Sequence, residues 1–318
     1  MTLFVTTVLA NAGTSGAMPP QASTIAPEVD GLFYFIFILC TIFFVGIVGA
    51  IIYFAAKYRQ RSSNDRTSAI DGNHRLELLW SAIPTVLLLV IFGWSFRIWL
   101  DMSVPPGDAI DVRVTGQKWS WSYDYPASGC VGVSEIVVPV GEPVKLTMSS
   151  LDVLHSYFVP AFRIKRDVIP NRYTVQWFTA TEVGTYPVSC TEYCGTGHSI
   201  MASQVRVVSR PEYEDWLAND CGGGDKSGEE LFRDKGCLAC HSVTGSKLVG
   251  PTMLGLYGRE ETLVGGEKVL VDDNYIRESI INPNAKVVQG YDPVMPTFKG
   301  RIKDRQIDAI IDYLKTLK

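Results

Sequence analysis

The sequence predicts a multidomain membrane protein that joins a two-helix transmembrane hairpin, an all-β domain and a small all-α domain. Three observations lead to this prediction. Two long apolar segments lie in the first third of the chain, a series of short alternating segments follows, and a Cys-x-x-Cys-His sequence stands in the last third. With 318 residues, 47% of them hydrophobic, the chain is long enough for two soluble domains plus membrane anchors.

The charge balance argues against a nucleic-acid-binding protein, and the cysteine spacing favours a metal or haem protein. The formal net charge is −4, from 29 basic and 33 acidic residues, so no clustered basic face points to nucleic acid. Four of the seven cysteines form two tight clusters, each with a histidine close behind it. This spacing favours metal or haem chemistry over a framework of disulfides.

Two apolar segments predict the membrane anchors. Residues 31–56 contain no charge over 26 positions, which at 1.5 Å per residue is enough to cross a hydrocarbon core of about 30 Å. Residues 76–100 are nearly as apolar, and their only charges, Glu77 and Arg97, lie close to the ends. Buried core helices are the alternative, but such helices rarely run so long without charge.

The basic residues orient the hairpin. Residues 1–30 contain no lysine or arginine, whereas five basic residues lie between the two spans: Lys57, Arg59, Arg61, Arg66 and Arg75. The positive-inside rule therefore places the short loop in the cytoplasm and both ends of the chain outside. The first ten residues are modestly apolar but lack a basic n-region, so they support a cleaved signal peptide poorly.

The chain is expected to divide into five parts: an external segment 1–30, a hairpin 31–100, an outer domain 101–209, a linker 210–224 and a last domain 225–318. The linker is polar, contains a predicted short helix and ends in a glycine run. A tether of roughly twenty residues would hold the last domain near the outer domain at high effective concentration.

The outer domain is predicted to be a small β-sandwich. Residues 108–209 contain short segments with alternation and with β-branched or aromatic enrichment, among them AIDVRVTG, EIVVPVG, PVKLTMSS, TVQWFTA and SQVRVV.

One loop of this domain gathers potential metal ligands. Cys190, Cys194, His198 and Met201 lie within twelve residues. Soft sulfur ligands beside imidazole select copper over magnesium or calcium. A second cysteine, which a blue-copper site lacks, suits a bridged pair of coppers, and His155 at a predicted strand end could supply a further imidazole. A Cys190–Cys194 disulfide or a zinc site are the alternatives.

The last domain carries a haem c attachment sequence. In Cys237-Leu-Ala-Cys240-His241 two thiols can add across the haem vinyl groups while the histidine lies beneath the iron. A zinc or thiol-redox site is the alternative, but no second Cys-x-x-Cys follows. Helices are predicted at residues 228–235 and 303–317.

From about residue 31 to 209 the chain resembles subunit II of haem-copper cytochrome c oxidases. The resemblance rests on Cys-x-Glu-x-Cys-Gly-x-x-His-x-x-Met, which begins at Cys190, and on Asp-Val-x-His-Ser, which begins at Asp152. It implies a cupredoxin-like fold that holds a binuclear copper centre. The implied ligands are Cys190 and Cys194, which bridge both coppers, His155 and Met201 on one copper, and His198 and the Glu192 carbonyl on the other.

The same resemblance implies roles for three further side chains. Glu192 would also reach a magnesium ion shared with subunit I. Trp119 matches a tryptophan between the incoming donor and copper, although Lys118 separates it from the glutamine that usually precedes it; aromatic stripes alone more often indicate core packing. Glu77 matches the entrance of a proton pathway in subunit I, and a solvated helix-end carboxylate is the alternative. Asn171 stands where the family usually has glycine, at a turn that needs positive φ.

The last domain resembles a small class I cytochrome c. This resemblance implies that Met295 is the sixth haem ligand and that the Pro251 carbonyl orients His241. Met253 is the other methionine of this domain, but it lies too close to Pro251. A methionine ligand raises the haem potential, which suits a donor to copper.

The prediction is therefore subunit II of a terminal cytochrome c oxidase with a fused cytochrome c, of the caa type. It would relay electrons from one covalent haem c to two coppers and on to subunit I, where oxygen reduction is coupled to proton translocation. The expected partners are subunit I, other membrane subunits, and a cytochrome c or a quinol-oxidising complex as donor. The expected location is a bacterial-type plasma membrane, with both soluble domains on the outer side.

Two other functions explain only part of this pattern. A tethered carrier that serves a soluble reductase needs only one anchor, and a copper-delivery protein leaves the haem motif unexplained. Cys130 and Cys221 remain after the ligands are assigned, and because both face an oxidising compartment they could pair and fasten the linker to the outer domain.

Overall fold

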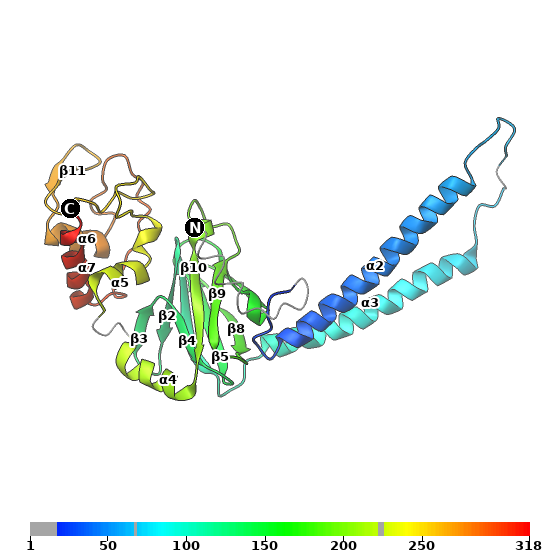
Figure 1. Cartoon of the computed structure of the whole chain (residues 1–318), viewed down its shortest axis with the longest axis horizontal. Helices are drawn as coiled ribbons and strands as arrows, with labels where there is room; N and C mark the ends of the chain where they lie inside the picture. Colours follow the sequence, from blue (N-terminus) through cyan, green and yellow to red (C-terminus); the bar gives the residue numbers. More distant parts are fainter. Residues whose placement is uncertain (1–17, 67–68, 222–225) are drawn as a thin grey trace.

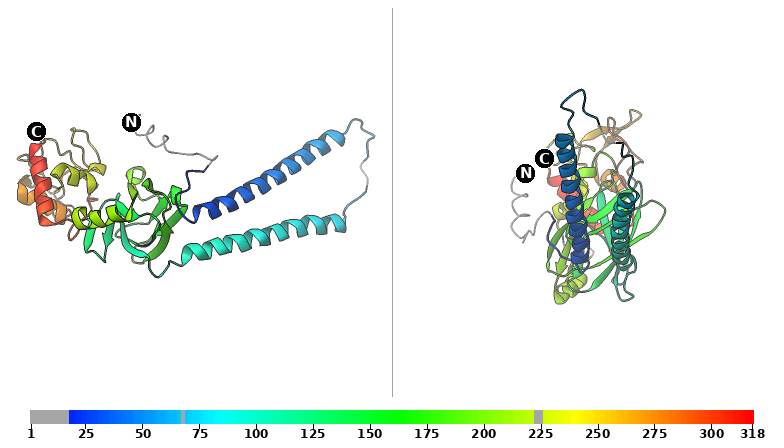
Figure 2. Two further views of the ribbon diagram at one scale, coloured as in Figure 1. Left: turned by 60° about the horizontal axis from the view of Figure 1, so that its bottom comes forward. Right: turned by 90° about the vertical axis from the view of Figure 1, so that its right-hand side faces the viewer.

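The computed structural model describes residues 18–66, 69–221 and 226–318. The start of the expected external segment, with its modestly apolar first ten residues, lies outside the described residues, as do the glycine run at 222–224 and the expected domain start at Asp225. Figures 1 and 2 show three parts in sequence: a helical hairpin at one end, a β domain in the middle and a smaller domain at the other end.

Two long helices form the predicted hairpin. Helix α2 spans Ala26–Lys57 and helix α3 spans His74–Ser103, and both are long and apolar enough to cross a membrane. Asn73 caps α3 by accepting a hydrogen bond from the Leu76 backbone N–H at 3.2 Å. The apolar side chains of both helices are exposed on the isolated chain, as expected for surfaces that face lipid or other membrane subunits.

The middle domain is a sandwich of two five-stranded sheets. The first sheet has the order β3-β2-β1-β5-β8, with strands Cys130–Val133, Ser120–Tyr125, Ile110–Gln117, Pro143–Ser150 and Thr174–Thr179. The second has the order β4-β10-β9-β6-β7, with strands Ile136–Pro139, Ala202–Val208, Gly184–Cys190, His155–Val159 and Ile164–Val168. The core lies between them; on β5, for example, Val144, Leu146 and Met148 are fully buried.

The base of α2 is fastened to this sandwich. The Arg163 guanidinium donates to both Asp30 carboxylate oxygens, at 2.7 and 2.8 Å, and both side chains are buried. The same guanidinium donates to the carbonyls of Pro20 and Pro160. These contacts fix the exit of the helix relative to the outer domain.

The segment expected to be a linker packs against the sandwich. Helix α4 (Arg210–Asp215) continues into a short π-helical turn, Trp216–Asp220. Tyr213 and Trp216 are buried, and the Trp216 ring lies 5.2 Å from the ring of Tyr125. This segment therefore belongs to the outer domain's core rather than forming a free tether, because two aromatic side chains three residues apart share one helix face.

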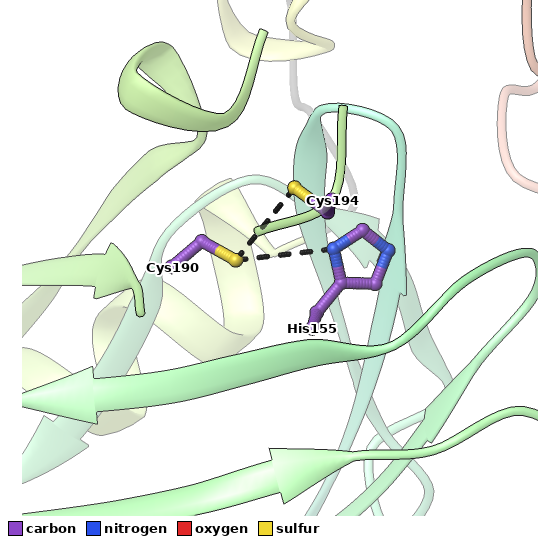
Figure 3. Close-up of side chains that lie close together, drawn as sticks. All are labelled: His155, Cys190 and Cys194. Carbon is purple, nitrogen blue, oxygen red and sulfur yellow. Dashed lines mark hydrogen bonds between the residues drawn. The ribbon is translucent and has the colours of Figure 1, made fainter. Parts of the chain in front are cut away.

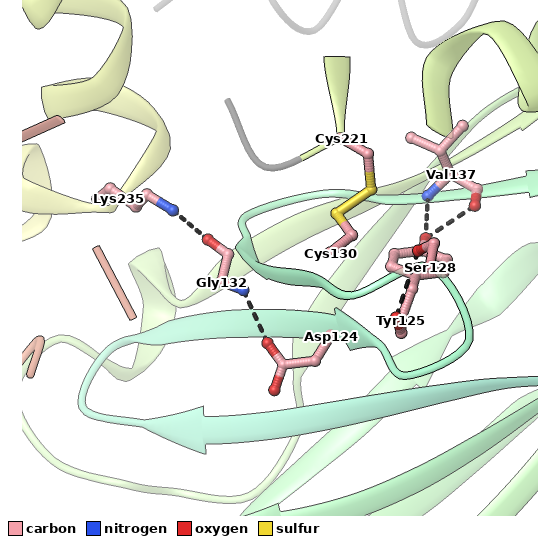
Figure 4. The surroundings of a disulfide bond; sticks show 8 residues. All are labelled: Asp124, Tyr125, Ser128, Cys130, Gly132, Val137, Cys221 and Lys235. Atoms are coloured by element: carbon pink, nitrogen blue, oxygen red, sulfur yellow. Dashed lines mark hydrogen bonds between the residues drawn. A yellow bond between two sulfur atoms is a disulfide. The ribbon is translucent and has the colours of Figure 1, made fainter. Parts of the chain in front are cut away.

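A disulfide closes the end of this segment. Cys221 bonds to Cys130 of β3, which confirms the predicted pairing (Figure 4). Only four residues then separate Cys221 from the first described residue of the last domain, Lys226.

The last domain is built from three helices with a small sheet. They are α5 (Gly228–Asp234), α6 (Asp273–Ile281) and α7 (Asp304–Thr316), so both predicted helices are present. A two-stranded sheet of β11 (Glu260–Thr262) and β12 (Lys268–Leu270) adds to the expected helical fold. The apolar face of α7, with Ile307, Ile310 and Ile311, packs into the core.

Candidate copper centre and haem cavity

Two cysteines and a histidine meet at one end of the sandwich. Cys190 ends β9, His155 begins the neighbouring β6, and Cys194 lies in the loop that returns to β10. The Cys190 Sγ lies 3.8 Å from the Cys194 Sγ and 3.9 Å from the His155 Nδ1 (Figure 3). All three side chains are buried, and the two unbonded sulfurs do not form the alternative disulfide.

The remaining predicted ligands surround this pair. The Cys194 Sγ lies 3.6 Å from the His198 Nδ1 and 3.8 Å from the Met201 Sδ. The Glu192 carbonyl lies 3.3 Å from the Cys190 Sγ. Two thiols between two imidazoles, a thioether and a carbonyl form a donor set that fits copper.

The two thiols differ in acidity. Burial raises the pKa of Cys190, but contacts with His155 and with the Ser156 and Glu192 backbones outweigh burial and lower it to about 6. Burial and then the charge of Cys190 raise the pKa of Cys194 to about 12. A cation between the sulfurs would offset this repulsion, so metal binding is coupled to loss of the second thiol proton.

Asp152 orients the buried histidine, a role that the sequence analysis did not assign to it. Its Oδ1 lies 2.8 Å from the His155 Nε2, and its Oδ2 accepts from the Lys118 backbone N–H at 2.7 Å. His155 therefore presents Nδ1 to the sulfurs. The sequence does contain a signal for this role: a carboxylate stands three residues before a predicted ligand histidine. Ligand histidines commonly donate their other N–H to a carboxylate.

Trp119 packs directly on the loop that carries Cys194. Its side chain is 7% exposed, and its Nε1–H donates to the Cys194 carbonyl at 3.2 Å. A Cβ added to Gly197 of the same loop would collide with the Trp119 ring. The tryptophan is thus held against the loop that carries Cys194 by close packing as well as by a hydrogen bond.

A cavity in the last domain collects the predicted haem residues. Cys237, Cys240, His241 and Met295 all line it, and most of its wall is apolar. Trp119 and its neighbours Lys118 and Ser120 line the same cavity from the outer domain. The cavity wall thus includes the tryptophan that also contacts Cys194.

The surroundings of His241 suit the predicted role of this side chain as an iron ligand. Its Nδ1 lies 2.8 Å from the Pro251 carbonyl, which fixes the Nδ1–H tautomer and leaves Nε2 free. Burial lowers the pKa of His241, so the ring is held neutral, the form that ligates iron. With the two thiols and the apolar wall, these features fit a covalently attached haem c. Met253 also lines the cavity but is buried in the domain core.

Two predicted residues lie elsewhere. Glu77 is in the first turn of α3, where its Oε1 accepts from the Asn73 backbone N–H at 3.3 Å and its Oε2 lies 3.3 Å from the His74 Nδ1. These contacts are those of a helix-end carboxylate, and the proton-pathway role stays a prediction. Asn171 has φ of 59°, which confirms the predicted positive-φ turn.

Comparisons with known proteins match all three parts of the chain. Family models described as the transmembrane and the periplasmic domain of cytochrome c oxidase subunit II match residues 11–98 and 128–208, and a cytochrome c model matches residues 226–318.

Curated relatives match over most of their length. Cytochrome c oxidase subunit 2 of Alkalihalophilus pseudofirmus is 29% identical and aligns with 100% of this chain and 95% of its own. The protein of the same name from Thermostichus vulcanus is 32% identical over 63% of this chain and 77% of its own. Among solved structures, the periplasmic domain of subunit II of cytochrome oxidase from Bradyrhizobium japonicum is 30% identical, covers 36% of this chain and 95% of its own, and has a TM-score of 0.35.

Proposed function

Because the chain belongs to the family of cytochrome c oxidase subunit II, we propose that it relays electrons from haem c to a binuclear copper centre and on to subunit I. There oxygen is reduced, and the reduction is coupled to proton translocation. One observation supports this proposal above the others: Trp119 contacts the Cys194 loop and also lines the cavity that holds Cys237, Cys240 and His241.

The proposed copper ligands are the groups that surround the cysteine pair: His155, Cys190, the Glu192 carbonyl, Cys194, His198 and Met201. A bridged copper pair, when bound, accepts and donates single electrons. The chain contributes a site at the ends of the adjacent strands β9 and β6 and in the loop between β9 and β10, where burial of His155 and both cysteines keeps water away and limits rearrangement during transfer.

The residues that would hold haem c are Cys237 and Cys240, through covalent attachment, and His241 and Met295, as ligands to its iron. Haem c, when bound, exchanges one electron with a donor. Trp119 would then stand where electrons pass from the last domain to the loop that carries Cys194.

Two further roles complete the proposal. The half-buried Glu192 side chain would reach a magnesium ion shared with subunit I. Glu77 would admit protons to subunit I from the cytoplasmic end of α3. A cytochrome c or a quinol-oxidising complex would supply the electrons.

The copper assignment is tested by Cys190→Ser and Cys194→Ser in the purified oxidase complex. Each change removes one thiol that would hold the copper pair, so each should abolish or convert its mixed-valence paramagnetic spectrum. Cys40→Ser is a matched control, because Cys40 is a free, exposed cysteine on α2. An unchanged spectrum in both loop variants would contradict the assignment.

A further inference from the structure

The last domain, which would hold the haem and is called the haem domain from here on, touches the outer domain, called the copper domain, at the hairpin of β2 and β3. Gly132 of β3 has φ of +70°, and its N–H donates to the Asp124 Oδ1 at 2.7 Å. Its carbonyl accepts a hydrogen bond from the Lys235 Nζ of the haem domain (Figure 4). A Cβ added to Gly132 would collide with the carbonyl oxygen of Arg301, so the two backbones meet where only glycine fits.

A second contact lies beside Trp119. The Arg301 guanidinium donates to the Oε1 of Gln117, which is 2% exposed and ends β1. Gln117 is two residues before Trp119 in the chain. The Arg301 contact therefore joins the haem domain to the same short segment that carries the tryptophan.

Both cations are costly to bury. Burial, and then the positive charge of Arg301, lower the pKa of Lys235 to about 8. Burial also lowers the pKa of Arg301, an effect that the nearby Asp124 carboxylate opposes. Buried charges contribute little net stability, but an unpaired one is strongly unfavourable. Both cations are half-buried and hydrogen-bond across the interface, Lys235 to Gly132 and Arg301 to Gln117, so they favour the docked position in which both bonds form.

The short covalent connection between the two domains also favours this docked position. Cys130 lies two residues from Gly132 on β3, and its disulfide with Cys221 brings the end of the outer domain to this hairpin. Only residues 222–225 then remain before the first described residue of the haem domain. A short connection between two contacting surfaces raises their effective concentration.

We infer that Lys235 and Arg301, with Gly132 as the glycine that lets them approach, are positioning residues that hold the haem cavity against Trp119 in one docked arrangement. This inference rests on the proposed electron relay. The step that it serves moves one electron from reduced haem c to the oxidised copper pair, and no bond forms or breaks.

The first test measures docking without electron transfer. In the purified, fully loaded oxidase complex, the amine of Lys235 is labelled with acetic anhydride over a range of pH, and the pH-independent rate at which its neutral form is modified is followed by mass spectrometry. Arg301→Ala removes a charged hydrogen bond of the interface, so the undocked population and the Lys235 labelling rate should rise about tenfold. Arg305→Ala is the matched control, since Arg305 is an exposed arginine of α7 in the same domain.

The second test measures transfer in the same complexes. Arg301→Ala and Gly132→Ala should slow electron transfer from haem c to copper and make its rate depend on solvent viscosity, while the haem potential and the copper spectrum stay at wild-type values. Arg301→Lys, which keeps the charge, should recover part of the rate. Gln117→Ala combined with Arg301→Ala should be no slower than Arg301→Ala alone, because both remove the same contact.

The outcomes separate the two proposals. If wild-type haem c does not reduce the copper pair, the electron relay itself fails. If wild-type transfer is observed, and Arg301→Ala and Gly132→Ala match Arg305→Ala in both labelling and transfer rates, the relay stands and the positioning roles are overturned.

Discussion

At the scale of single residues, the carboxylate of Asp152 connects His155, a proposed copper ligand, to the segment that carries Trp119. It binds the ring of His155 and the backbone N–H of Lys118 at once. Burial opposes ionisation of this carboxyl, but the hydrogen bonds from His155 and Lys118 outweigh burial and lower its pKa. The charge that orients His155 is therefore present at neutral pH.

Replacing Asp152 by Asn should weaken copper binding. Asn keeps the shape but loses the charge that holds the His155 tautomer, and removing such a partner lowers metal affinity by roughly 10- to 100-fold. Competition with a copper chelator measures the affinity. Asp111→Asn is the control, because Asp111 is a partly exposed carboxylate of β1 paired with Lys145. Equal affinities in the two variants would contradict the orienting role of Asp152.

At the scale of secondary-structure elements, the buried Arg163–Asp30 pair determines how α2 leaves the copper domain. Replacing Arg163 by Ala leaves the Asp30 carboxylate buried without its cation, which should lower the free energy of unfolding by about 3–5 kcal/mol. Denaturant unfolding of the oxidase complex, followed through the copper absorption, measures this change in the free energy of unfolding. The control is Lys145→Ala, which breaks a partly exposed pair worth about 0–1 kcal/mol. A loss no larger than that of the control would count against the anchor.

At the scale of the whole molecule, the haem cavity, Trp119 and the proposed copper site predict the order in which electrons are transferred. Replacing Met295 by Ala should lower the haem potential or admit external ligands, and so slow reduction by the natural donor while the copper spectrum stays intact. Replacing Trp119 by Phe should leave haem c reducible and slow the next step, haem c to copper. Rapid mixing of the intact complex with its donor resolves both steps. Copper reduction at the wild-type rate when the haem cannot be reduced would disprove this order.

The features that the sequence determined are those coded by neighbouring residues. Charge-free segments predicted α2 and α3, because spanning a membrane depends on length and composition alone. Strict alternation predicted β5 with its observed bounds, Pro143–Ser150. The Cys-x-x-Cys-His run and the ligand-rich loop at Cys190 also carry their chemistry within a dozen residues, so both candidate sites were recognisable from spacing.

Tertiary structure alone decided what depends on distant residues. A strand end was predicted at His155, but the bounds of β2 and β6 were not, because most of their side chains are buried on both faces and alternation is lost. The sequence left Cys130 and Cys221 only as candidates, since a disulfide forms where the fold brings the two Cα atoms close, here to 5.6 Å. The packing of Trp216 on Tyr125 and the contact of Arg301 with Gln117 join residues far apart in the chain, and such pairs leave no periodic signal in a sequence.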